Sequence, residues 1–111
     1  MIAWQNLESV PQIDKLADQS YKYPVLIFKH STRCNISAIA KMRLEDQWTF
    51  LTGDQSIYFL DILRFRDVSN AIAERFSVHH ESPQLLVIDN GDCTYDASHF
   101  DIHLRDIQEL L

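Results

Sequence analysis

Residues 24–37 read PVLIFKHSTRCNIS, an apolar run followed at once by a polar segment with a cysteine at its centre. The run 24–28 is short, continuous and partly β-branched, which predicts a central strand buried on both faces. From residue 35 to about residue 48, apolar residues recur at helical intervals with charges between them, which predicts a helix. Cys34 therefore stands where a central strand has ended and a helix begins.

The neighbouring segments extend this pattern in both directions. Before the central strand we expect a short strand at Ile2–Trp4 and a helix near Pro11, where Ser9 and Gln12 have capping-box spacing. After the second helix we expect a strand at Ile57–Leu63, a helix from Asp67 to Phe76, a strand at Gln84–Ile88, a turn at Asn90–Gly91 and a partner strand at Cys93–Asp96. The last expected element is a helix that is capped by Ser98 and carries four apolar residues on one side, Phe100, Leu104, Ile107 and Leu111. The order β-α-β-α-β-α-β-β-α favours an α/β fold with a parallel core and a closing antiparallel hairpin. We expect a central mixed sheet of four to five strands with helices on both faces.

Composition and charge limit the classes of function. The chain has 111 residues, a mass of 13.0 kDa and 46% hydrophobic residues, so we expect one domain over residues 1–111. A formal net charge of −6 with scattered Lys and Arg argues against a nucleic-acid partner. The sequence contains no run of eighteen apolar residues and no leader-like start, so we expect a cytoplasmic protein without a membrane partner. Its two cysteines, Cys34 and Cys93, should then stay reduced.

Cys34 is the first candidate catalytic residue. Backbone N–H groups and the helix dipole converge where a helix begins, and they stabilise a thiolate there. Arg33 adds a positive charge, and Ser37 lies one helical turn later with a hydroxyl able to hydrogen-bond the sulfur, which makes it the second candidate. The alternatives are an inert buried thiol and a serine that is only a tolerated helix residue.

The sequence also resembles a known family. The element order, the C-x-x-S motif at the start of the second helix and Ser82–Pro83 before the penultimate strand resemble the thioredoxin superfamily. More narrowly, KHSTRCNIS at 29–37, the early Trp4 and DASHFDI at 96–102 are similar to the monothiol bacilliredoxins. Those proteins usually carry Cys-Pro-Ile-Ser, whereas this chain has Asn35 at the position of the proline.

The resemblance implies a thioredoxin-like fold and removal of bacillithiol from protein mixed disulfides. The Cys34 thiolate would attack the bacillithiol sulfur and free the client thiol, and a further small thiol or a reducing system would regenerate it. The implied partners are S-bacillithiolated client proteins and a low-molecular-weight thiol, with bacillithiol as substrate and no cofactor. The resemblance implies a cis Pro83, and Ser82 before it would pair with an extended client. The expected substrate-binding residues are Thr32, Arg33, Asn35, Ser82 and Pro83.

The other cysteine and the histidines carry weaker signals. The strand after Pro83 should run away from the active end, which places Cys93 about 15–20 Å from Cys34 at ~3.3 Å per residue, too far to resolve it. We therefore expect no catalytic role for Cys93. We expect His30 on a loop surface; the alternative is that it tunes the pKa of Cys34, four residues later. The remaining histidines lack the spacing of a zinc site, so we expect no metal; they are His79, His80, His99 and His103.

Two other classes of function stay open on the sequence. Monothiol glutaredoxins also carry C-x-x-S and hold an iron–sulfur cluster between two subunits, but they use Cys-Gly-Phe-Ser, and this chain has neither that glycine nor that phenylalanine. The second class is an interaction domain that keeps the fold without redox work. For that class, Cys34 should alkylate no faster than a free cysteine.

Overall fold

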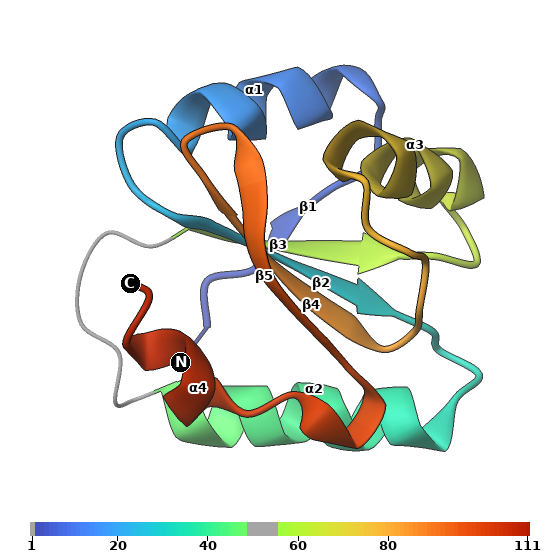
Figure 1. Ribbon diagram of the computed structural model, residues 1–111. Coiled ribbons are helices and arrows are strands. Elements are labelled where there is room, and N and C mark those ends of the chain that lie inside the picture. Colours follow the sequence, from blue (N-terminus) through green and yellow to red (C-terminus); the bar gives the residue numbers. More distant parts are fainter. Residues whose placement is uncertain (1, 49–55) are drawn as a thin grey trace.

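The computed structural model describes residues 2–48 and 56–111, and it shows one five-stranded sheet between two layers of helices (Figure 1). The elements are β1 (Gln5–Asn6), α1 (Pro11–Gln19), β2 (Val25–His30), α2 (Asn35–Gln47), β3 (Ser56–Asp61), α3 (Arg66–Phe76), β4 (Gln84–Asp89), β5 (Asp92–Ser98), η2 (His99–Asp101) and α4 (Leu104–Gln108). The expected α/β fold with a central mixed sheet is confirmed.

The strand order is β1-β3-β2-β4-β5, with β1, β3 and β2 parallel and β4 and β5 antiparallel to their neighbours. Every residue of β2 is buried, as expected for the central strand. Helices α1 and α3 cover one face of the sheet, and α2 and α4 cover the other (Figure 1). Successive β2 side chains point to opposite faces, so Ile27 packs under α1 and α3 while Phe28 packs on the α2 side.

Two local signals in the sequence act as predicted. Asn90 and Gly91 have φ angles of 52° and 83°, the left-handed pair that a two-residue hairpin turn needs. The Gln12 side chain reaches back and accepts the backbone N–H of Ser9 at 3.0 Å. The expected capping interaction therefore forms, although the N-cap residue of α1 is Val10.

Two expected elements differ in the structure. The first strand is Gln5–Asn6 rather than Ile2–Trp4, because Ile2 and Trp4 use their side chains to cover the sheet while strand pairing with β3 starts at Gln5. The single last helix is replaced by η2 and α4. His99 has a left-handed φ of 56°, and Ser98 makes no side-chain capping hydrogen bond, so a helix cannot run on from Ser98. Phe100 is consequently exposed instead of lying on the apolar side of a helix.

The topology brings three strand ends to one end of the sheet. His30 at the end of β2 pairs with Asp61 at the end of β3, and the neighbouring Lys29 pairs with Gln84 at the start of β4. We call this the cysteine end of the sheet, because the chain passes from His30 to Cys34 there. The Ser82–Pro83 segment enters β4 at the same end.

Candidate active site

Cys34 is the N-cap residue of α2. Its backbone is extended, with φ −116° and ψ 119°, and its carbonyl accepts the first helical hydrogen bond from the Ala38 N–H at 3.1 Å. Its own N–H donates to the Ser31 carbonyl at 3.2 Å, which closes a tight turn after β2. The side chain is partly exposed. A thiol in this place faces solvent beside the free N–H groups of the first helical turn.

The candidate substrate-binding residues surround this turn. Thr32, Arg33 and Asn35 are exposed, and within residues 2–48 and 56–111 none of their side chains makes a hydrogen bond. Pro83 is buried, and its bond to Ser82 is cis, as the resemblance implies. The structure therefore brings all five to the cysteine end, and their binding roles stay predictions.

His30 differs from the expectation. It is the last residue of β2 rather than a surface loop residue, and its side chain is buried. Its ring stacks on Phe28 with centroids 5.9 Å apart and lies 5.3 Å from the ring of Phe59. Burial lowers the pKa of His30, the Lys41 ammonium lowers it further, and Asp61 opposes both effects. The strand extends through Lys29 and His30 because neighbouring strands pair with both residues.

The hydroxyl of Ser37 is held by two protein groups. The side chain is fully buried, its Oγ accepts the Ser31 N–H at 3.0 Å, and it lies 2.6 Å from Nδ1 of His30. Within the described part of the chain it makes no hydrogen bond to the sulfur. The expected hydrogen bond to Cys34 is therefore replaced by hydrogen bonds to His30 and Ser31 at the end of β2, because the first turn of α2 packs against that strand. A catalytic role for Ser37 stays a prediction.

Sequence reasoning missed a second polar group at the cysteine end. Lys29 is completely buried, and its Nζ lies 3.2 Å from both the Ser69 carbonyl oxygen and Nδ1 of His80. Burial lowers the pKa of Lys29 to about 8. The one available signal in the sequence was a lysine directly after four apolar strand residues. Because side chains alternate along a strand, Lys29 points to the same face of the sheet as Ile27, which is the face covered by α3.

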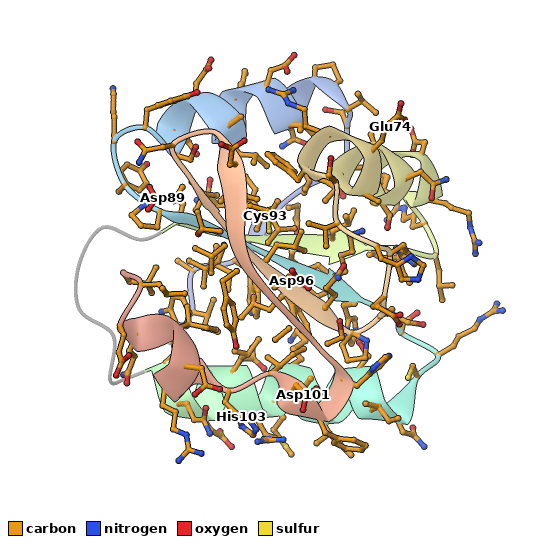
Figure 2. The ribbon with its side chains drawn as sticks, viewed as in Figure 1. Glu74, Asp89, Cys93, Asp96, Asp101 and His103 are labelled. Atoms are coloured by element: carbon orange, nitrogen blue, oxygen red, sulfur yellow. The ribbon has the colours of Figure 1, made fainter. Side chains whose placement is uncertain are left out.

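Cys93 lies far from this site. It pairs with Ile88, which pairs with Val25 at the opposite end of β2, and Figure 2 shows it on β5 near the hairpin. Burial raises the pKa of the Cys93 thiol to about 11. Its Sγ lies 3.3 Å from the Tyr95 carbonyl oxygen, which holds it as a weak donor within the strand. A raised pKa makes Cys93 a poor nucleophile near neutral pH, so Cys34 stays the candidate nucleophile.

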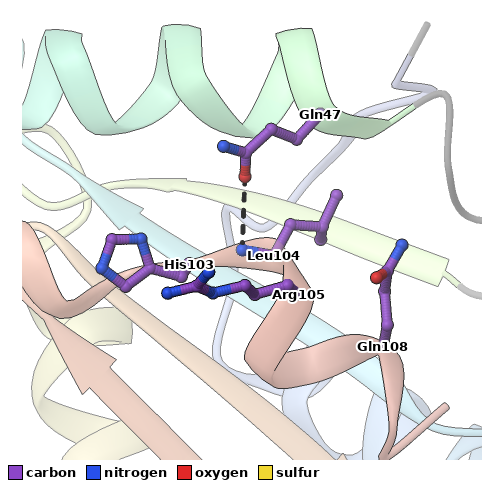
Figure 3. Close-up of a pocket in the computed structure, with 5 residues that line it drawn as sticks. All are labelled: Gln47, His103, Leu104, Arg105 and Gln108. Atoms are coloured by element: carbon purple, nitrogen blue, oxygen red, sulfur yellow. Dashed lines mark hydrogen bonds between the residues drawn. The ribbon is translucent and has the colours of Figure 1, made fainter.

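A cavity of about 400 Å³ lies elsewhere, between the C-terminal end of α2 and α4 (Figure 3). Its lining includes Gln47, whose side-chain oxygen accepts the Leu104 N–H, and His103, whose Nδ1 is 2.9 Å from a guanidinium nitrogen of Arg43. Cys34 is at the other end of α2, which is about 20 Å long at 1.5 Å per residue. The cavity is thus separate from the thiol.

The arrangement defines a class of protein. A partly exposed cysteine is the N-cap residue of the second helix, a cis proline enters the antiparallel strand at the same end of the sheet, and the other cysteine is remote. This is a thioredoxin-fold protein in which Cys34 is the candidate active-site thiol. The family model for the monothiol bacilliredoxin BrxC matches residues 5–107, and the chain belongs to that family. Family and fold together support a thiol redox role.

Solved structures agree on the fold. A protein described as a candidate oxidoreductase with a thioredoxin fold is 29% identical, with a TM-score of 0.79 over 96% of this chain and 91% of its own. Thioredoxin from Fasciola hepatica is 14% identical, with a TM-score of 0.74 over 96% of this chain and 97% of its own. Thioredoxin from Malassezia sympodialis is 17% identical, with a TM-score of 0.72 over 99% and 89%.

Two further observations concern metals and membranes. Among the described residues, no three His, Cys, Asp or Glu side chains gather closely enough to hold a metal ion. In the same part of the chain, no helix has the length and apolar character needed to cross a membrane.

Proposed function

We propose that this protein removes bacillithiol from mixed disulfides on client proteins, with Cys34 as the nucleophile. The observation that supports the proposal most directly is the position of Cys34, a partly exposed N-cap thiol beside a cis-proline segment in a monothiol bacilliredoxin. The low-molecular-weight thiol is bacillithiol in this proposal, and it acts as a substrate rather than as a cofactor.

The reaction is a thiolate–disulfide exchange. The Cys34 thiolate attacks the bacillithiol sulfur of the mixed disulfide, a new S–S bond forms between Cys34 and bacillithiol, and the old S–S bond breaks. The client sulfur leaves as a thiolate and takes a proton from water. A second thiol, as its thiolate, then attacks the bacillithiol sulfur on the enzyme, forms a new disulfide with bacillithiol and releases Cys34 as a thiolate. No electrons are needed beyond those that this second thiol supplies.

The surrounding residues have separate roles in the proposal. Thr32, Arg33 and Asn35 contact the small thiol, and the Arg33 guanidinium meets a carboxylate of its malate group. Ser82 and Pro83 face the client. Ser37 fixes the first turn of α2 through its two buried hydrogen bonds.

The test is the intact mass of the protein after mixing with a bacillithiol-modified client. Wild type and Cys93→Ser should release the client thiol and gain one bacillithiol adduct, whereas Cys34→Ser should do neither. Cys93→Ser is the matched control because it removes a thiol of the same chain at the far end of the sheet. Wild-type protein that gains no adduct while Cys34 still alkylates would refute the proposal. Iron and sulfide reconstitution without oxygen should then be tried, and a coloured dimer would support cluster binding instead.

A further inference from the structure

Lys29 is a buried charge that the thiol reaction does not use. Its side chain has no exposed surface, and it enters the layer between the sheet and α3. Burying an ammonium is unfavourable unless hydrogen bonds compensate. Lys29 Nζ donates to the Ser69 carbonyl in α3 and to Nδ1 of His80, each at 3.2 Å. An ammonium can only donate, so the His80 ring nitrogen is the acceptor.

His80 belongs to the segment 77–83 between α3 and β4. The Ser69 hydroxyl also lies 3.1 Å from its Nδ1, so the ring is tied to α3 as well as to β2. Burial lowers the pKa of His80, and the neighbouring Lys29 lowers it further, while Glu81 opposes them. A lowered pKa favours the neutral ring, which is the form that accepts a hydrogen bond.

Gln84 provides a second tie to the same segment. Its amide nitrogen donates to the His79 carbonyl at 3.0 Å, and Gln84 is the partner of Lys29 in the β2–β4 ladder. Its side-chain oxygen is buried and has no hydrogen-bond partner among the described residues, whereas the Lys29 ammonium has a third N–H to donate. The polar cluster of Lys29, Ser69, His80 and Gln84 thus holds the segment at two successive residues.

The held segment leads directly to Ser82 and Pro83. The Pro83 carbonyl accepts the His99 N–H at 2.9 Å, so this residue is fixed to the turn after β5. The Ser82 backbone lies just outside the β4 ladder, and among the described residues its N–H and C=O have no hydrogen-bond partner. Unpaired backbone groups beside a strand are the groups to which an extended peptide adds.

We propose that Lys29 is a positioning residue for client binding, an inference that rests on the proposed function. Through His80, its buried ammonium holds the segment 79–83 so that the Ser82 backbone can pair with an extended stretch of the client protein. The contact concerns the client chain rather than the bacillithiol sulfur. Loss of the Lys29–His80 hydrogen bond should therefore weaken the binding of protein clients. It should leave the reaction with small disulfides and the reactivity of Cys34 unchanged.

The experiment compares two substrates, a bacillithiolated protein and the mixed disulfide of bacillithiol with cysteine. His80→Leu removes the acceptor, His80→Gln restores an amide acceptor, and His79→Leu is the matched control because the His79 side chain is 89% exposed. Loss of the part-buried hydrogen bond between Lys29 and His80 should raise KM for the protein about five-fold in His80→Leu. The kcat for the protein, both constants for the small disulfide and the Cys34 alkylation rate should not change. His80→Gln and His79→Leu should resemble wild type.

Lys29→Met is the second variant, because it removes the donor of the same hydrogen bond. It should raise KM for the bacillithiolated protein and leave KM for the small disulfide unchanged. An unchanged KM in both His80→Leu and Lys29→Met, with active wild type, would overturn the inference and leave the proposed function standing. Equal losses on both substrates would also overturn it, because they would indicate a general structural defect. Wild type that is inactive toward both substrates would refute the proposed function and the inference together.

Discussion

Replacement of Lys29 by Met should change how the stability of this protein depends on pH. Burial lowers the pKa of Lys29 from 10.5 to about 8 in the folded protein. Between these two values the unfolded chain binds more protons than the folded one, so the stability of the wild type rises with pH in this window. Below pH 8 the folded protein bears the full unfavourable contribution of a buried ammonium, and above pH 10.5 it bears none.

The magnitude follows from the shift. A difference of 2.5 between the two pKa values corresponds to about 3 kcal/mol at ~1.36 kcal/mol per unit. Methionine has a similar length and no charge, so Lys29→Met removes this contribution. It also leaves the Ser69 carbonyl and the His80 ring without their donor, which costs about 1–2 kcal/mol. The variant should therefore be at least as stable as wild type at pH 7 and less stable near pH 10.5.

The assay is urea unfolding followed by tryptophan fluorescence at steps from pH 7 to pH 10.5. The measured quantity is the free energy of unfolding of wild type minus that of Lys29→Met, since other titrating groups cancel in this difference. It should rise by about 3 kcal/mol across the range. Lys15→Met is the matched control, because Lys15 is exposed on α1 and its difference should stay flat. A flat difference for Lys29→Met as well would show that the buried side chain keeps the pKa of an exposed lysine.

Three shorter predictions test other parts of the structure. Gly91→Ala should lower the free energy of unfolding by about 1 kcal/mol in the same urea assay, because Gly91 has a φ of 83°, which a residue with a Cβ rarely adopts. At pH 8 iodoacetamide should modify Cys34 well before Cys93, since a pKa near 11 leaves about one Cys93 thiol in a thousand ionised. Equal rates by peptide mass spectrometry would contradict the raised pKa of Cys93. Ser37→Ala should cost about 1–3 kcal/mol in urea, because it leaves two buried partners without a hydrogen bond, and no loss of stability would count against that pairing.

Local patterns sufficed for the elements that depend on near neighbours in the chain. The Asn90–Gly91 turn was predictable because few residue pairs adopt two successive left-handed conformations. The central strand followed from an unbroken apolar run, and the strand–helix junction at Cys34 followed from the change of period after it. The last helix was not predictable in the same way. Its apolar spacing is helical, but the left-handed His99 separates η2 from α4.

The partners of the polar residues at the cysteine end could not be read from the sequence. His30 and Lys29 follow the apolar run and look like the start of a surface loop, yet pairing with β3 and β4 draws both into the sheet and buries them. Ser37 has the spacing to meet the sulfur, but its hydroxyl is taken by the end of β2. In each case a residue from another element decides the outcome.

The sequence by itself determined that a cysteine would begin a helix after a buried strand, because helix and strand periodicity act over a few residues. Only the tertiary structure decided that Lys29 would meet Ser69 and His80, which stand 40 and 51 residues later in the chain. Such a contact depends on sheet order and helix packing, and no local pattern encodes which of several polar groups will face a buried ammonium. The candidate nucleophile was therefore visible in the sequence, and the hydrogen bonds that hold the segment beside it became visible only in the fold.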